Sequence, residues 1–172
     1  MGKISKAVHD IGTAVWFGGT LMGTLAMNPA VEVLDDPEER GKMVDEGWAL
    51  FQPWAAAGLL SALIAHVAIR RGGPEDASGC YKAAAVTKDV LMATALVSSV
   101  ASMALGEYAM HQEPDAYTPI EDATTPSDET PYETAQAQSG LTIASWVQLL
   151  SGAGIFLTNA IMSAEKEKQP VL

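Results

Sequence analysis

The chain has 172 residues, enough for one domain, and its 21 acidic and 10 basic residues give a formal net charge of −11. This acidic balance excludes a nucleic-acid-binding protein, which needs a basic surface. The single cysteine, Cys80, excludes an intramolecular disulfide and a metal site built from clustered cysteines.

The charged residues are confined to a few blocks, and long stretches between them carry no charge. About 20 apolar residues span the ~30 Å hydrocarbon core of a bilayer. We therefore expect an all-α four-helix transmembrane bundle, a single integral membrane domain over residues 1–172 with helices at about 7–28, 47–70, 83–108 and 140–164. The alternative is a soluble four-helix bundle, which would carry a charged stripe on each helix. Residues 55–69 have small side chains where that stripe would lie.

The first predicted helix contains VHDIGTAVWFGG at residues 8–19. At helical spacing one face collects a histidine, a tryptophan and three glycines: His9, Gly12, Trp16, Gly19 and Gly23. The pair Gly19-x-x-x-Gly23 is typical of membrane helices that approach closely. Asn28-Pro29 is expected to end this helix, because the residue before a proline avoids the α conformation.

An acidic segment leads from the first to the second helix. Asp36 has the character of an N-cap and Pro37 that of a first helical residue, with acids following in the first turn. This pattern predicts a short surface helix near residues 37–46 that runs into the second transmembrane helix. One face of that second helix again collects small residues and a histidine: Ala55, Gly58, Ala62 and His66.

The third predicted helix, at about residues 83–108, carries Asp89 near its start, and the fourth carries small residues around Gly152. Between them, residues 109–139 form an acidic, proline-rich segment for which composition predicts an extended or poorly ordered external loop. His111 lies in this segment and is expected only to be solvated. The acids do not follow the alternating spacing of an EF-hand calcium loop.

Eight of the ten basic residues fall at one predicted end of the bundle: Lys3, Lys6, Arg70, Arg71, Lys82, Lys88, Lys166 and Lys168. Positive charge marks the cytoplasmic side, so we expect both termini inside and a multi-pass protein of the bacterial plasma membrane. No A-x-A-like cleavage site follows the basic start, which favours a retained first helix over a signal peptide.

Three ionisable residues are predicted to converge near the inner surface. His9 and His66 each lie about one turn, ~5 Å, inside the basic boundary, and Asp89 lies at a similar level. Asp10 is expected to point away from His9. Ionisable groups inside a membrane are costly, so each needs a partner or a function. Three interpretations stay open: a hydrogen-bonded contact between helices, a haem or metal site, or a proton-handling site. In the haem or metal site His9 and His66 are ligands, and Asp89 is either a third ligand or the carboxylate that orients an imidazole.

The segment HDIGTAVWFGG at residues 9–19, with its W-x-G-G turn at 16–19, resembles the opening helix of small bacterial membrane proteins of the copper-resistance D type and related four-helix families. Together with Asn28-Pro29, Gly47-Trp48 and the glutamine-rich approach to the last helix, the pattern is similar to uncharacterised actinobacterial membrane proteins. The resemblance implies the fold, the membrane location and copper handling.

We expect first a structural or accessory subunit without a cofactor, in contact with the lipid bilayer and with other membrane protein subunits. It would pack through small-residue helix faces: Gly12, Gly19, Gly23, Gly58, Ala62 and Gly152. The alternative is a haem- or metal-binding redox or resistance component that uses His9 and His66. A second alternative is a small transporter, with a polar path along Thr13, Thr20, Thr94, Ser98 and Gln148. Enzymatic activity is not expected, since the sequence has no nucleophile or phosphate-loop motif.

Overall fold

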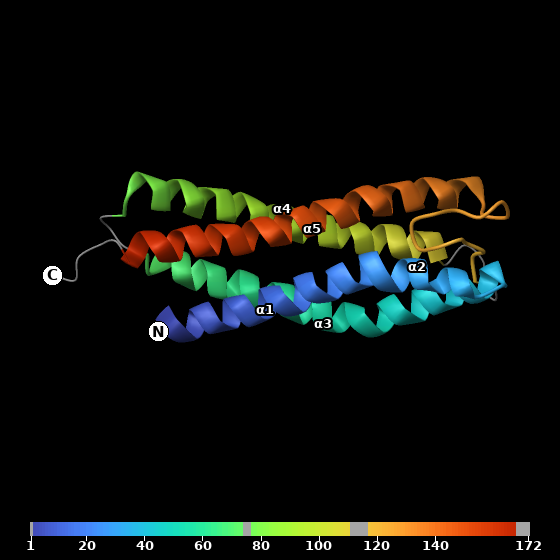
Figure 1. Cartoon of the computed structure of the whole chain (residues 1–172), viewed down its shortest axis with the longest axis horizontal. Coiled ribbons are helices and arrows are strands. Elements are labelled where there is room, and N and C mark those ends of the chain that lie inside the picture. Colours follow the sequence, from blue (N-terminus) through green and yellow to red (C-terminus); the bar gives the residue numbers. More distant parts are fainter. Residues whose placement is uncertain (1, 74–76, 111–116, 168–172) are drawn as a thin grey trace.

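The computed structural model describes residues 2–73, 77–110 and 117–167, and nearly all of these residues are helical. Four long helices lie alongside one another in an elongated bundle (Figure 1). The one β feature in the described part of the chain is an isolated bridge between Ile120 and Pro126. The expectations for His111 and Lys168 fall outside the described residues.

The first helix is longer than predicted. Helix α1 covers Gly2–Met22 and continues through a π-helical turn, η1 at Gly23–Met27, into the short helix α2 at Asn28–Ala30 and a 3-10 turn, η2 at Val31–Val33. The backbone N–H of Asn28 bonds to the carbonyl of Gly23, five residues back. This wider turn lies directly before Pro29, which has no N–H to donate. Asn28-Pro29 therefore does not end the helix.

Helix α3 covers Pro37–Arg71 without interruption. Its start agrees with the sequence pattern, because the Asp36 carboxylate accepts a hydrogen bond of 2.9 Å from the backbone N–H of Glu38. Residues 37–46 are the first turns of this helix and do not form a separate surface helix. Pro53 lies inside α3, and the helix continues through it.

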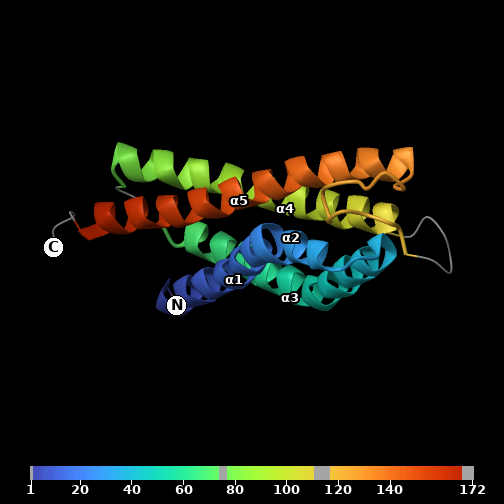
Figure 2. The same ribbon diagram turned by 45° about the vertical axis from the view of Figure 1, so that its right-hand side comes forward.

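Helix α4 covers Gly79–Met110 and helix α5 covers Tyr132–Glu167. α1 packs along α3 and α4 packs along α5, and the two pairs meet less extensively, through α1 with α5 and α3 with α4 (Figure 2). Three of the helices, α3, α4 and α5, are long and apolar enough to cross a membrane. Helix α1, with Lys3, Lys6 and Asp10 near its start, is not among these three, whereas four spanning helices were predicted.

Much of the apolar surface points outward. Only 17% of the most apolar segment of α4 is buried within the molecule, and the corresponding share for α5 is 33%. The exposed side chains include large aliphatic residues on three helices: Ile64, Val97, Val100, Leu150 and Leu157. Contiguous exposed apolar surface of this kind indicates a membrane or a protein partner around the helices.

The predicted packing glycines lie where two elements of this chain approach closely. A Cβ atom on Gly12 would lie 2.5 Å from the carbonyl oxygen of Gly58, so α1 and α3 are in direct backbone contact there. The other predicted glycines make room for aromatic rings on neighbouring helices: Gly19 for Phe51, Gly23 for Trp48 and Gly152 for Phe17. Ala62 is fully buried beside the Gly12–Gly58 contact.

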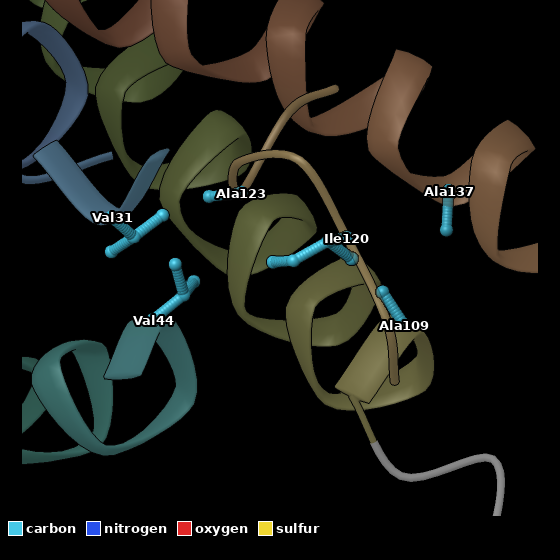
Figure 3. Close-up of a cluster of buried hydrophobic side chains, with 6 residues drawn as sticks. All are labelled: Val31, Val44, Ala109, Ile120, Ala123 and Ala137. Carbon is cyan, nitrogen blue, oxygen red and sulfur yellow. The ribbon is translucent and has the colours of Figure 1, made fainter. Parts of the chain in front are cut away.

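The segment before α5 was expected to be extended or poorly ordered. Its described part, residues 117–131, is not helical and packs against the ends of the helices. Ile120 is fully buried, and Figure 3 shows it among the apolar side chains at this end of the bundle: Val31, Val44, Ala109, Ala123 and Ala137. The Ile120 N–H donates to the Pro37 carbonyl at 3.2 Å, and Arg40 pairs with Glu121. One buried apolar residue anchors a segment whose average composition is polar.

Candidate functional site

The two predicted histidines lie side by side inside the bundle. His9 on α1 is 0% exposed and His66 on α3 is 6% exposed. Their ring centroids are 6.0 Å apart, with the ring planes inclined at 51°. The close approach at Gly12 produces this proximity, because Gly12 follows His9 by about one turn and contacts the backbone of Ala62, one turn before His66.

Each imidazole uses one nitrogen to bind a carboxylate. His66 donates from Nε2 to Asp89 at 2.7 Å, and Arg70 donates to the other oxygen of Asp89 at 2.9 Å. His9 donates from Nδ1 to Asp10 at 3.1 Å, and Asn159 donates to the same oxygen of Asp10 at 3.3 Å. An ionised carboxylate only accepts hydrogen bonds, so these contacts place the proton on Nδ1 of His9 and on Nε2 of His66.

The opposite ring nitrogens, Nε2 of His9 and Nδ1 of His66, are buried and have no hydrogen-bond partner among the residues that the structure describes. With the protons placed as above, each of these nitrogens carries a lone pair. Buried polar atoms nearly always have a partner. Each of these two atoms can therefore accept a proton or a hydrogen bond from water, or bind a metal ion, and the two rings that carry them are neighbours.

Lys88 is the residue of this site that the sequence interpretation missed. It was taken only as a marker of the inner boundary, yet it is 2% exposed. The carboxylates of Asp10 and Asp89 attract its ammonium group, and its charge also acts on both imidazoles. Helical spacing contains the signal, because Lys88 falls in register with buried residues of α4: Tyr81, Ala85, Met92 and Ala95.

The structure brings His9, His66 and Asp89 together, but in a different arrangement from a three-ligand metal centre. Asp89 binds Nε2 of His66, whereas the ring nitrogens without a partner are Nε2 of His9 and Nδ1 of His66. Within residues 2–73, 77–110 and 117–167 no group of three His, Cys, Asp or Glu side chains is placed to hold a metal ion. Asp10, expected to point away from His9, is its hydrogen-bond partner.

Both rings are buried within the bundle. The haem alternative stays a prediction. A cavity of about 510 Å³ lies elsewhere in the described bundle, and neither histidine lines it.

The predicted polar path consists largely of local hydrogen bonds. Thr13, Thr20 and Ser98 each donate at 2.8 Å to a carbonyl of their own helix, four residues back. Gln148 instead belongs to a network between helices. Trp16 donates to Ser99 at 3.0 Å, Ser99 to Gln148 at 3.4 Å, and Gln148 to Ser102 at 2.6 Å. These bonds tie α1, α4 and α5 together and form no relay from the histidines.

Comparison of the chain with family models, with curated proteins and with solved structures gives no match. The resemblance of residues 9–19 to the copper-resistance D type stays a prediction. The function is therefore inferred from the geometry of the buried histidines.

Proposed function

We propose that this chain is a multi-pass protein of the bacterial plasma membrane, with both termini in the cytoplasm, that binds one transition-metal ion between His9 and His66. The apolar helices α3, α4 and α5 support the membrane location. The basic residues clustered at one end support the orientation.

The observation that carries the proposal is the pair of buried imidazoles with unpartnered nitrogens. A metal ion lies about 2 Å from each ligating nitrogen, which puts two ring centroids about 5–6.5 Å apart for coordination angles from tetrahedral to linear. The 6.0 Å between His9 and His66 falls in this range. Metal-ligating histidines also commonly donate their second N–H to a carboxylate, as both do here.

Copper is the ion that this pair fits best. Imidazole nitrogen suits copper and zinc, but protein zinc sites take four ligands in a tetrahedron. His9 and His66 supply two nitrogens, and Cys80 is exposed. The resemblance of residues 9–19 also implies copper handling. The positive charge of Lys88 opposes that of the ion, which favours reversible binding over a permanent structural metal.

The contacts at the small residues give less support to an accessory subunit that packs on partner helices. Gly12 and Gly58 contact each other, and Gly152 accommodates Phe17, so these positions are used within the chain. A partner helix could not use the same close approaches without separating α1 from α3.

The test is metal analysis of protein purified in detergent after incubation with copper. We expect one ion per chain, with nitrogen neighbours at about 2 Å in X-ray absorption. His9→Ala and His66→Ala should each abolish binding, while His111→Ala, the matched control at the third histidine, should retain it. Circular dichroism establishes that each variant is folded. Copper retained by both His9→Ala and His66→Ala, or absent from the parent protein, would overturn the proposal.

A further inference from the structure

A cavity of about 510 Å³ lies in the half of the bundle away from the two histidines. It is lined from α1, α3, α4 and α5 and by residues 123 and 124 of the segment that precedes α5. It lies where α3 and α4 meet, the side on which the two helix pairs pack less extensively. Neither its position nor its residues belong to the His9–His66 site.

Aromatic side chains form much of its wall. Trp16, Trp48 and Phe51 line it, and the rings of Trp48 and Phe51 meet edge to face with centroids 6.1 Å apart. The indole N–H groups are already used, that of Trp16 by Ser99 and that of Trp48 by Asn28 at 2.9 Å. These tryptophans therefore offer ring surface to a ligand.

Hydrogen-bond donors line the same cavity. The side chains of Gln52 and Ser145 form no hydrogen bond with the described residues, and Ser102 accepts one from Gln148 while its own hydroxyl hydrogen is not donated. These groups are half-buried beside apolar side chains of the cavity wall, and each can donate a hydrogen bond to a ligand or to water. Two carboxylates, Asp45 and Glu107, line the end of the cavity nearer residues 117–131.

The rim of the cavity is apolar and open. Leu60, Val100 and Met103 line it and are exposed on the outside of the bundle. In a bilayer these side chains face acyl chains, so a molecule dissolved in the membrane reaches the cavity without passing through water.

The size of the cavity decides between a small molecule and a partner helix. A helix about 10 Å across takes up about 850 Å³ for two turns alone. The observed 510 Å³ is smaller than that and lies in the range of small-molecule sites, roughly 300–1,000 Å³.

We propose that this cavity binds a lipid-soluble molecule of the quinone class: a flat ring with carbonyl oxygens and an apolar tail. The ring lies against Trp16, Trp48 and Phe51. The carbonyl oxygens accept hydrogen bonds from Gln52, Ser102 or Ser145, and the tail leaves between Leu60 and Val100.

Tryptophan fluorescence provides the test. Trp54 and Trp146 are exposed and do not line the cavity, so the double variant Trp54→Phe/Trp146→Phe leaves Trp16 and Trp48 as the only fluorophores of this type. This protein, in lipid nanodiscs, is titrated with a benzoquinone that carries a ten-carbon tail. We expect quenching that saturates at one molecule per chain.

Two adjacent residues on α3 supply a matched pair of variants. Ala56 lines the cavity, whereas Ala57 is exposed and does not. Ala56→Phe should weaken binding at least tenfold and Ala57→Phe should leave it unchanged. Gln52→Leu should weaken binding about five- to tenfold, because it removes a hydrogen-bond donor. Gln52 is not among the residues in contact at Gly12, so this variant leaves that helix contact unchanged.

Quenching that rises linearly with quinone and is equal in the Ala56→Phe and Ala57→Phe variants would overturn the proposal, since it reports partition into lipid. An alkylbenzene with the same ten-carbon tail is the second probe. If it displaces the quinone with equal affinity, the site holds any apolar chain and the assignment to carbonyl compounds is wrong.

Discussion

Replacement of Gly12 by alanine tests whether the approach of α1 to α3 holds the two histidines together. The added Cβ would lie 2.5 Å from the Gly58 carbonyl oxygen and 3.0 Å from the Ala62 backbone nitrogen. Optimal contacts lie near 3.5 Å, so the two helices have to separate by about 1 Å. These two obstructing atoms belong to the backbone and cannot rotate away. The third, the Oγ of Ser61 at 2.5 Å, belongs to a side chain that can rotate.

Overpacking of this kind costs about 1–3 kcal/mol, and the rigidity of the obstruction places Gly12→Ala toward the upper limit. Alanine regains up to about 1 kcal/mol through its higher helix propensity. We therefore expect a net loss of about 2 kcal/mol in the free energy of unfolding. Gly18→Ala is the control, because a Cβ at Gly18 meets no atom within 4 Å.

Thermal unfolding in detergent, followed by circular dichroism, measures the stability of both variants. Copper affinity measured by competition with a chelator reports on the histidines, which need placement within about 0.5 Å to share an ion. We expect Gly12→Ala to lose at least tenfold in affinity and Gly18→Ala to lose none. If Gly12→Ala were as stable as Gly18→Ala and bound copper equally well, the close approach would not hold the histidines in place.

Three other perturbations address the site and the loop. Lys88→Met removes a buried positive charge beside the imidazoles, which should raise copper affinity about tenfold, and the chelator competition assay would contradict this with an unchanged or lower affinity. Asp89→Asn weakens the carboxylate partner of His66 and should lower copper affinity about 10- to 100-fold, whereas Asp45→Asn, distant from the histidines, should not. Ile120→Ala removes the apolar anchor of residues 117–131 at a cost of about 2–4 kcal/mol in local stability. Limited proteolysis should then cut this segment faster, and an unchanged cleavage rate would show that its hydrogen bonds suffice.

The sequence predicted the meeting of His9 and His66 because both follow the same rule. Each lies one helical turn from small residues, and small residues face a neighbouring helix. Antiparallel helices with equal distances from their basic ends then place the two rings at one level. The start of α3 at Pro37 could also be predicted from the sequence, because the capping of a helix depends on a few adjacent residues.

Two features of the site, the His9–Asp10 hydrogen bond and the burial of Lys88, were not predicted from the sequence. Adjacent residues on a helix do not normally face each other, so the contact between His9 and Asp10 was not expected. Lys88 was assigned by charge alone, although its register with Met92 and Ala95 marks it as buried.

The packing of residues 117–131 on the helix ends could not be predicted from composition, which averages over many polar residues. This packing depends on Ile120 and on the close backbone approach at Gly41. A Cβ on Gly41 would lie 2.1 Å from the carbonyl oxygen of Thr118, so the segment rests directly on α3 at this point. The amino-acid composition of the segment does not predict this contact.

The segment at residues 117–131 also bears on how a ligand reaches the cavity. Ala123 and Thr124 form part of the cavity wall, while Ile120 is fixed between the ends of the helices. In the membrane location proposed above, the rim residues Leu60 and Val100 would face the lipid. A ligand would then enter from the side of the bundle and not past residues 117–131.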